Sequence, residues 1–112
     1  MYINEHVINK MQDTLKLAGD ATRLKILFCL LDELDTSSSD PHHLIEKCVN
    51  DIALQIGCSQ SLVSHQLKAL KDADLVGTRK EGTKVYYFLK DKHVRLLIGV
   101  AYDHVMEEEE ND

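Results

Sequence analysis

Two short pairs of potential metal ligands near the C-terminus are the residues best suited to chemistry in this chain. They are Asp91-x-His93 and His104-x-x-Glu107. Two imidazoles and two carboxylates make a four-coordinate nitrogen and oxygen site, which suits Zn(II) and, less tightly, Co(II). The apolar spacing of the segment predicts one amphipathic helix over about 91–106, on which the two histidines lie about 16 Å apart. A single ion therefore cannot contact both pairs on one helix.

Antiparallel pairing of two copies of this helix removes the difficulty. The midpoint between the two histidines and the midpoint between the two carboxylates both fall beside Gly99, where backbones can approach closely. We therefore expect a homodimer with two symmetry-related sites. Each site takes the Asp91-x-His93 pair from one protomer and the His104-x-x-Glu107 pair from the other. The alternative is that all four are ordinary surface polar residues beside an apolar stripe.

Length and composition restrict the elements that can position these ligands. A chain of 112 residues fits a single domain, 1–112, in which dimerisation would help to bury apolar surface. No stretch reaches the length of a membrane span, and the polar N-terminus does not read as a signal peptide, so we expect a cytoplasmic protein. The three cysteines, Cys29, Cys48 and Cys58, form no disulfide framework, in keeping with a reducing compartment.

Apolar periodicity and turn residues predict a mainly helical chain that carries one β-hairpin. Asp20 and Ser59 are expected to cap the helices that follow them. Leu24, Leu27, Phe28 and Leu31 are expected to face the core. The expected elements are helices over 4–17, 21–34, 44–56, 60–72 and 91–106, a polar loop at 35–43, a hairpin at 75–89 that turns through Glu81-Gly82, and a frayed acidic tail at 107–112.

Residues 44–72 are expected to form a helix, a glycine turn and a second helix, and a hairpin follows them. This order of elements predicts a winged helix-turn-helix. The helix over 60–72 would enter the DNA major groove, with Leu62, Val63, Leu67 and Leu70 facing inward. The net charge of the chain is −6, but residues 59–90 hold six basic residues against three acidic ones. The expected contacts to bases and phosphates come from Gln60, Ser61, Ser64, His65, Lys68, Arg79, Lys80 and Lys84. The alternative is a winged helix that serves as a protein-interaction module.

The chain resembles the ArsR/SmtB family of bacterial metal-responsive repressors. The resemblance rests on residues 17–27, 51–53 and 59–70 and on Gly82-x-x-Val85-Tyr86-Tyr87, and it extends over nearly the whole chain. It implies a homodimer paired through the N- and C-terminal helices. It also implies that the metal-free dimer binds double-stranded operator DNA beside genes for metal efflux or sequestration, and that zinc releases it. The zinc-sensing branch carries Asp-x-His and His-x-x-Glu/His on the last helix, which matches Asp91, His93, His104 and Glu107.

The resemblance also implies part of a second metal site. Cys48-x-x-Asp51 matches half of it, and His6 could supply a ligand from the partner's N-terminal arm. The chain departs from the pattern because its arm has no cysteine and its loop at 35–43 is longer than usual.

Two further functions compete with the zinc-responsive repressor. In the first, the same DNA-binding module responds to oxidation of Cys48 and Cys58, or to a thiophilic metal at Cys48. In the second, the metal site activates water for hydrolysis. Four protein ligands leave no open coordination position, and no nucleophile or oxyanion donor accompanies them, so we expect no enzymatic activity.

Overall fold

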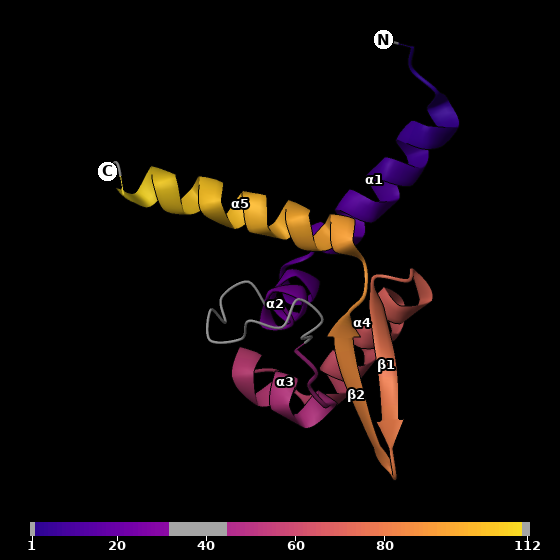
Figure 1. Cartoon of the computed structure of the whole chain (residues 1–112), viewed down its shortest axis with the longest axis vertical. Helices are drawn as coiled ribbons and strands as arrows, with labels where there is room; N and C mark the ends of the chain where they lie inside the picture. Colours follow the sequence, from indigo (N-terminus) through magenta and orange to yellow (C-terminus); the bar gives the residue numbers. More distant parts are fainter. Residues whose placement is uncertain (1, 32–44, 111–112) are drawn as a thin grey trace.

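The computed structural model describes residues 2–31 and 45–110 (Figure 1). A body of three helices and a hairpin lies below two longer helices, α1 and α5, in the view of Figure 1. The mainly helical winged helix-turn-helix expected from the sequence is confirmed. No helix in the described ranges combines the length and apolar character needed to cross a membrane. The elements are α1 (Glu5–Gly19), α2 (Ala21–Cys29), α3 (Val49–Ile56), α4 (Gln60–Asp72), β1 (Val76–Glu81), β2 (Lys84–Leu89) and α5 (Lys92–Glu110).

Side-chain caps set the starts of several helices. Asp20 accepts a hydrogen bond from the Arg23 N–H at 3.1 Å, and Ser59 accepts one from the Leu62 N–H at 3.1 Å. Each cap satisfies a donor that has no partner within its own helix. Both predicted caps are therefore confirmed, and α4 begins and ends where the sequence predicted.

The second helix is shorter than predicted. α2 ends at Cys29, because the N–H groups of Leu30 and Leu31 bond back to carbonyls three residues earlier and close the last turn tightly. Leu27 and Leu31 are buried as expected, but Leu24 is 42% exposed. Leu24 and the half-buried Phe28 face a groove beside α5 instead of the core. The rest of the predicted helix and the loop at 35–43 lie outside the described residues.

The third helix begins later than predicted, at Val49. Before it, Lys47 exchanges two backbone hydrogen bonds with Tyr87 of β2, at 3.0 and 2.8 Å. The backbone groups of Lys47 are thus satisfied by the hairpin, and Cys48 takes the N-cap position of α3. A contact with a residue so distant in the chain overrides the local helical pattern.

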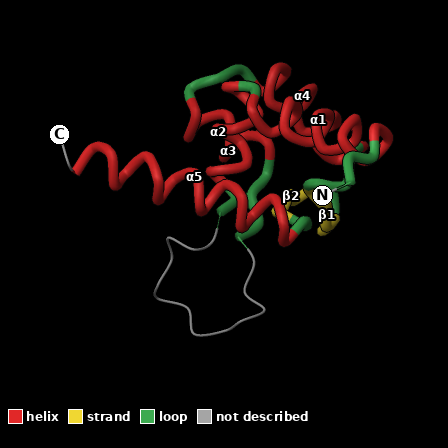
Figure 2. Tube along the Cα trace, turned by 90° about the horizontal axis from the view of Figure 1, so that it is seen from above, coloured by secondary structure: helices red, strands yellow, loops and turns green. Residues whose placement is uncertain are grey.

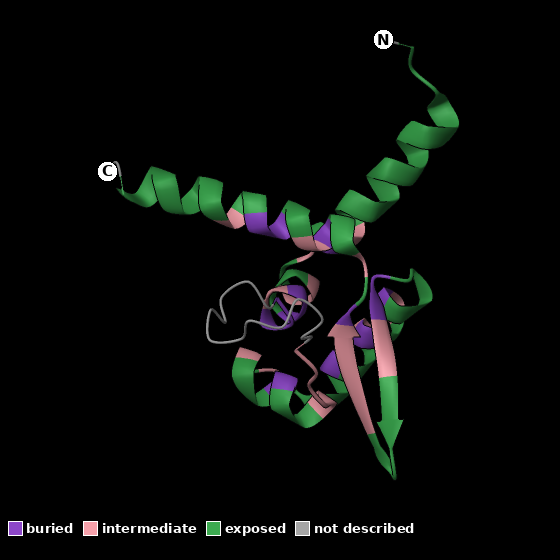
Figure 3. Ribbon diagram, viewed as in Figure 1, coloured by how far each residue is buried: buried purple, intermediate pink, exposed green. Residues whose placement is uncertain are grey.

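The core lies where α2, α3 and α4 meet the base of the hairpin (Figure 3). Val63, Leu67 and Leu70 of α4 are fully buried there, as predicted. Leu62 is 39% exposed, which corrects its predicted inward position. It lies about 100° around the helix from Val63, on a side that no described element covers.

The last helix is longer and less buried than predicted. α5 continues to Glu110, so the segment from Glu107 onward is not a frayed tail as far as the structure describes it. Glutamate is a good helix former and no glycine or proline interrupts the run. Val94 and Ile98 are buried, but the remaining stripe residues Leu97, Ala101 and Val105 are exposed. Figures 1 and 2 show the C-terminal part of α5 extending away from the body.

Candidate nucleic-acid interface and metal-ligand helix

The turn between α3 and α4 presents the start of α4 to solvent. Gly57 has φ +70°, a conformation that favours glycine, and its N–H bonds back to close α3. Gln60, Ser61, Ser64 and His65 follow on the exposed side of α4, opposite the buried stripe. The four predicted base-reading residues therefore share one accessible surface.

Gln60 already has a partner in the free protein. Its Nε2 donates a hydrogen bond to Oδ1 of Asn50, the second residue of α3, at 2.9 Å. Sequence reasoning missed Asn50, because the turn between two helices, and not helical spacing, brings these residues together. Lys68 pairs with Asp72 at 3.0 Å, but both side chains are largely exposed, and such surface pairs are weak.

The basic residues of the hairpin differ in their surroundings. Lys80 and Lys84 are exposed beside the Gly82 turn. Arg79 contacts two carboxylates, Glu46 at 2.7 Å and Glu81 at 2.9 Å. Hydrogen bonds to Glu81 and Glu46 raise the pKa of Arg79 above its already high value.

Arg79 also lies over the Tyr86 ring, with its guanidinium carbon 4.8 Å from the ring centroid. Two of its five N–H donors bond to carboxylates, and the negative charges of Glu46 and Glu81 oppose the approach of a phosphate. Glu46 was also missed by sequence reasoning, since 33 residues separate it from Arg79.

The four predicted metal ligands lie along α5 and just before it. Asp91 caps this helix: its Oδ1 accepts from the N–H groups of His93 at 2.8 Å and Val94 at 3.0 Å. His93 and His104 are exposed, and Nε2 of His104 lies 3.3 Å from Oε1 of Glu108, one turn further along. Glu107 is exposed as well.

Within one described chain, no group of three or more histidine, cysteine or acidic side chains is placed to hold an ion. The structure brings Asp91 close to His93 but leaves His104 and Glu107 further along the helix, since α5 is continuous between the pairs. The three residues of the predicted second metal site are likewise only partly brought together. Cys48 Sγ lies 3.1 Å from Asp51 Oδ2, while His6 is exposed on α1.

The three cysteines are free. Cys48 and Cys58 lie at opposite ends of α3, whose eight residues span about 12 Å along its axis. A disulfide needs Cα atoms within about 7 Å, and oxidation therefore cannot join these two within one chain without moving the helix. Cys29 belongs to the core, where burial raises the pKa of its thiol and Lys47, 3.8 Å from the sulfur, opposes that rise.

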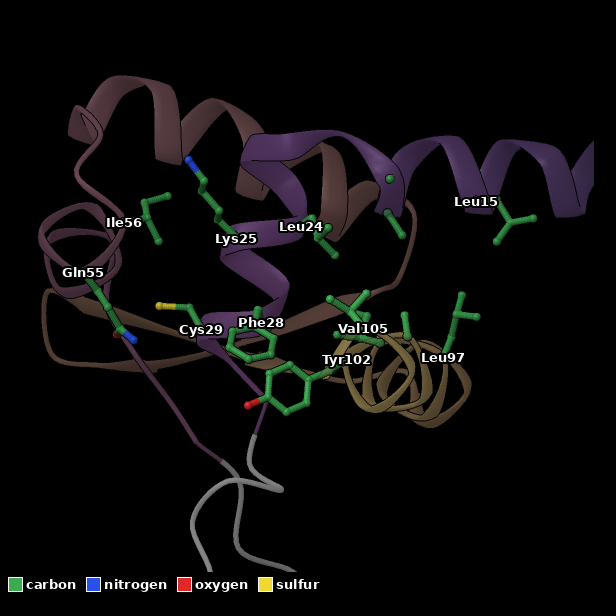
Figure 4. Close-up of a pocket in the computed structure, with 14 residues that line it drawn as sticks. Leu15, Leu24, Lys25, Phe28, Cys29, Gln55, Ile56, Leu97, Tyr102 and Val105 are labelled. Carbon is green, nitrogen blue, oxygen red and sulfur yellow. The ribbon is translucent and has the colours of Figure 1, made fainter. Parts of the chain in front are cut away.

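An apolar groove of about 800 Å³ lies between α1, α2, α3 and α5 (Figure 4). Figure 4 shows side chains directed into it, among them Leu15, Leu24 and Leu97. Phe28 and Tyr102 also line the groove, and the centroids of their rings are 5.2 Å apart. The apolar face of α1 continues this surface: Val7, Ile8, Met11 and Leu15 are all at least 43% exposed. The described residues of the single chain leave this surface uncovered.

Comparisons with known proteins agree with this geometry. Residues 45–78 match the family described as "Bacterial regulatory protein, arsR family". The cadmium resistance transcriptional regulatory protein CadC homolog of Staphylococcus aureus is 34% identical over 95% of this chain and 88% of its own length. The transcriptional repressor SmtB homolog of Synechocystis sp. is 34% identical over 88% of this chain and 65% of its own length.

A solved structure extends the similarity to the arrangement of the elements. It is the homodimeric winged helix-turn-helix DNA-binding domain of Mb0332 from Mycobacterium bovis, described as a possible ArsR-family regulator. Its TM-score is 0.75 at 26% identity, and the match covers 96% of this chain and 89% of that one.

Proposed function

Because this chain belongs to the ArsR family of bacterial regulatory proteins, we propose that it represses transcription as a homodimer that releases operator DNA when a metal ion binds. Members of this family are DNA-binding regulators and not enzymes, so the expectation of no enzymatic activity is confirmed. We take residues 1–112 as one regulatory domain and place it in the cytoplasm, where DNA is accessible. The exposed polar face of α4 beside the basic hairpin carries the proposal most directly.

The proposed DNA contacts divide into two classes. The first class would face base edges, since its members occupy the N-terminal half of the exposed face of α4: Gln60, Ser61, Ser64 and His65. Lys68, Arg79, Lys80 and Lys84 would contact phosphates, which position the protein without reading sequence. A basic surface of this kind is compatible with a net charge of −6, because phosphates respond to local charge.

Gln60→Ala and Lys80→Ala are expected to weaken DNA binding in different ways. A binding-site selection from random duplexes first identifies the operator. Gln60→Ala should then reduce discrimination at one base pair per half-site, on the order of tenfold. Lys80→Ala should weaken binding to every sequence and lower the salt slope by about 1.8, for two phosphates per dimer. Fluorescence anisotropy on cognate and scrambled duplexes at several salt concentrations measures both effects. Equal losses on both duplexes for Gln60→Ala would contradict its assignment.

Glu46→Gln is expected to strengthen binding to DNA of any sequence. The change removes one of the two carboxylates that hold Arg79 and leaves the guanidinium freer to contact phosphate. One additional phosphate contact is worth about fivefold in affinity near physiological salt, so the two Arg79 residues of a dimer should together give about 25-fold. Glu109→Gln, an exposed position at the far end of α5, makes the same change in net charge and is the control. Equal gains in the two variants would attribute the effect to net charge alone.

The proposed dimer covers the groove and the apolar faces of α1 and α5. These faces hold most of the exposed large apolar side chains of the described chain. Contiguous apolar surface of this extent marks an interaction site. Antiparallel contact of two α5 helices also brings the separated ligand pairs together, which a single chain does not do.

The donor set fits a divalent ion such as Zn(II), with Co(II) as a surrogate. His93 and His104 are 80% and 69% exposed, and Oδ1 of Asp91 is the oxygen that caps α5, which leaves Oδ2 for an ion. When bound, the ion would link α5 of one protomer to α5 of its partner. Relatives include a cadmium resistance regulator, so the preference for zinc is part of the proposal.

Regulation requires that the metal-bound dimer bind the operator more weakly than the metal-free dimer. The coupling is reciprocal, and values of about 1–3 kcal/mol correspond to a 5- to 150-fold loss of operator affinity. The regulated genes would then encode metal efflux or sequestration proteins.

Optical titration of the reduced protein with Co(II) tests the ligand set. Tetrahedral bands without a thiolate band, saturating at one ion per protomer, support Asp91, His93, His104 and Glu107. A strong thiolate band would instead favour the second candidate, a thiophilic metal held by Cys48 and Asp51 with His6 from the partner. The contact between Cys48 and Asp51 is the observation behind that candidate.

A further inference from the structure

The hydrogen bond between Asn50 and Gln60 joins the two helices of the helix-turn-helix at the DNA-facing surface. Asn50 lies in the first turn of α3, Gln60 is the first residue of α4, and both are exposed. The Gln60 Nε2 to Asn50 Oδ1 distance is 2.9 Å, a well-formed hydrogen bond. Gln60 is also one of the proposed base-reading residues, at the N-terminal end of α4.

The backbone beneath this contact is held by the core and by the connection between the helices. Ile52 of α3 and Val63 of α4 are both fully buried in the same core. The Gly57 turn and the Ser59 cap define the connection. The relative position of the two backbones is therefore set by the fold, and the hydrogen bond restricts the side-chain torsions of Gln60 and Asn50.

The hydrogen-bonding capacity of glutamine allows both contacts at once. Its amide has two N–H donors and one carbonyl acceptor. A bidentate contact with adenine uses one donor and the acceptor. Asn50 takes one donor, so a second donor and Oε1 stay available. Ordering the side chain before binding reduces the entropy lost when the complex forms.

We propose that Asn50 is a positioning residue that determines specificity: it orients the Gln60 amide and thereby sets the preference for an A·T pair at the position that Gln60 faces. The inference rests on the proposed function, because it requires that α4 read DNA. In this proposal Asn50 of α3 influences base selection through Gln60, without contacting a base itself.

Three variants test the inference on duplexes selected from a random pool by the wild-type dimer. Gln60→Ala identifies the base pair that Gln60 reads as the position where preference disappears. Asn50→Ala should then lower the A·T preference at that pair by about fivefold, with other positions and the salt slope unchanged. The double variant should show no further loss beyond Gln60→Ala.

Asn50→Asp is the conservative variant. It tests whether the hydrogen bond to Gln60, and not the asparagine side chain as such, sets the base preference. Aspartate can only accept, so it retains the hydrogen bond from Gln60 Nε2. Its negative charge should weaken binding to all duplexes through phosphate repulsion, while the preference at the Gln60 position stays as in the wild type. Asn9→Ala, on the side of α1 opposite its apolar face, controls for loss of an exposed helical asparagine.

The outcomes distinguish this inference from the function on which it rests. If Asn50→Ala weakens binding to all duplexes equally, or leaves the A·T preference unchanged, the positioning role is wrong while DNA reading by Gln60 stands. If the wild-type dimer enriches no sequence from the pool, the proposed function itself fails, and the inference with it.

Discussion

Asp91→Asn is expected to weaken Zn(II) binding by about 100-fold or more while leaving the stability of the metal-free protein unchanged. Asparagine caps helices as well as aspartate does, so its Oδ1 can still accept from the His93 and Val94 N–H groups. It lacks the carboxylate that an ion would bind. Loss of residues that only support a ligand already costs 10- to 100-fold in affinity, and loss of a ligand should cost at least as much.

Two further variants separate the two roles of Asp91. Asp91→Ala should lose both, with the same fall in metal affinity and about 0.5–2 kcal/mol less stability from the missing cap. His93→Ala should lose metal affinity alone, because His93 contributes only its backbone N–H to the start of α5.

Competition of each variant with a chromophoric zinc chelator, together with thermal unfolding of the metal-free form, measures both quantities. Asp103→Asn makes the same chemical change at an exposed position of α5 outside the ligand set and should bind zinc as the wild type does. Wild-type affinity in Asp91→Asn would remove Asp91 from the site.

Leu97→Glu is expected to convert the dimer to monomers, with the dimer dissociation constant rising on the order of 10³-fold. Each dimer would bury two copies of Leu97, and burial of a leucine is worth about 1.5–3 kcal/mol. The charged replacement adds a desolvation cost. The fold of the monomer should persist, because Leu97 lines the groove and is 42% exposed in the single chain.

Sedimentation velocity and circular dichroism measure assembly and folding separately. Leu54→Glu is the matched control, since Leu54 is 75% exposed on α3, away from the groove. The monomeric variant should also bind Co(II) weakly, because each site takes ligands from two protomers. A Leu97→Glu protein that stays dimeric would place the interface elsewhere. A monomer that binds one Co(II) tightly would contradict the shared site.

Features that depend on local interactions could be predicted from the residues alone. Helix starts at Asp20 and Ser59 follow from the hydrogen bonds that these side chains form within three residues. The reversal at Gly82 follows from backbone conformation, with φ +63°. The separation of the two ligand pairs on one helix follows from the helical rise, so one ion could bind both pairs only if a second copy of the chain contributed one of them.

Packing between distant elements fixes which surfaces face the core and which side chains meet across the fold, and this required the three-dimensional structure. Leu24 and Leu62 belong to apolar patterns but stay exposed, because no element among residues 2–31 and 45–110 covers them. Lys47 leaves a helical pattern because β2 offers its backbone better partners. Arg79 with Glu46 and Gln60 with Asn50 are contacts between separate elements. Local periodicity carries no information about such pairs, since their distance depends on how whole helices and strands pack.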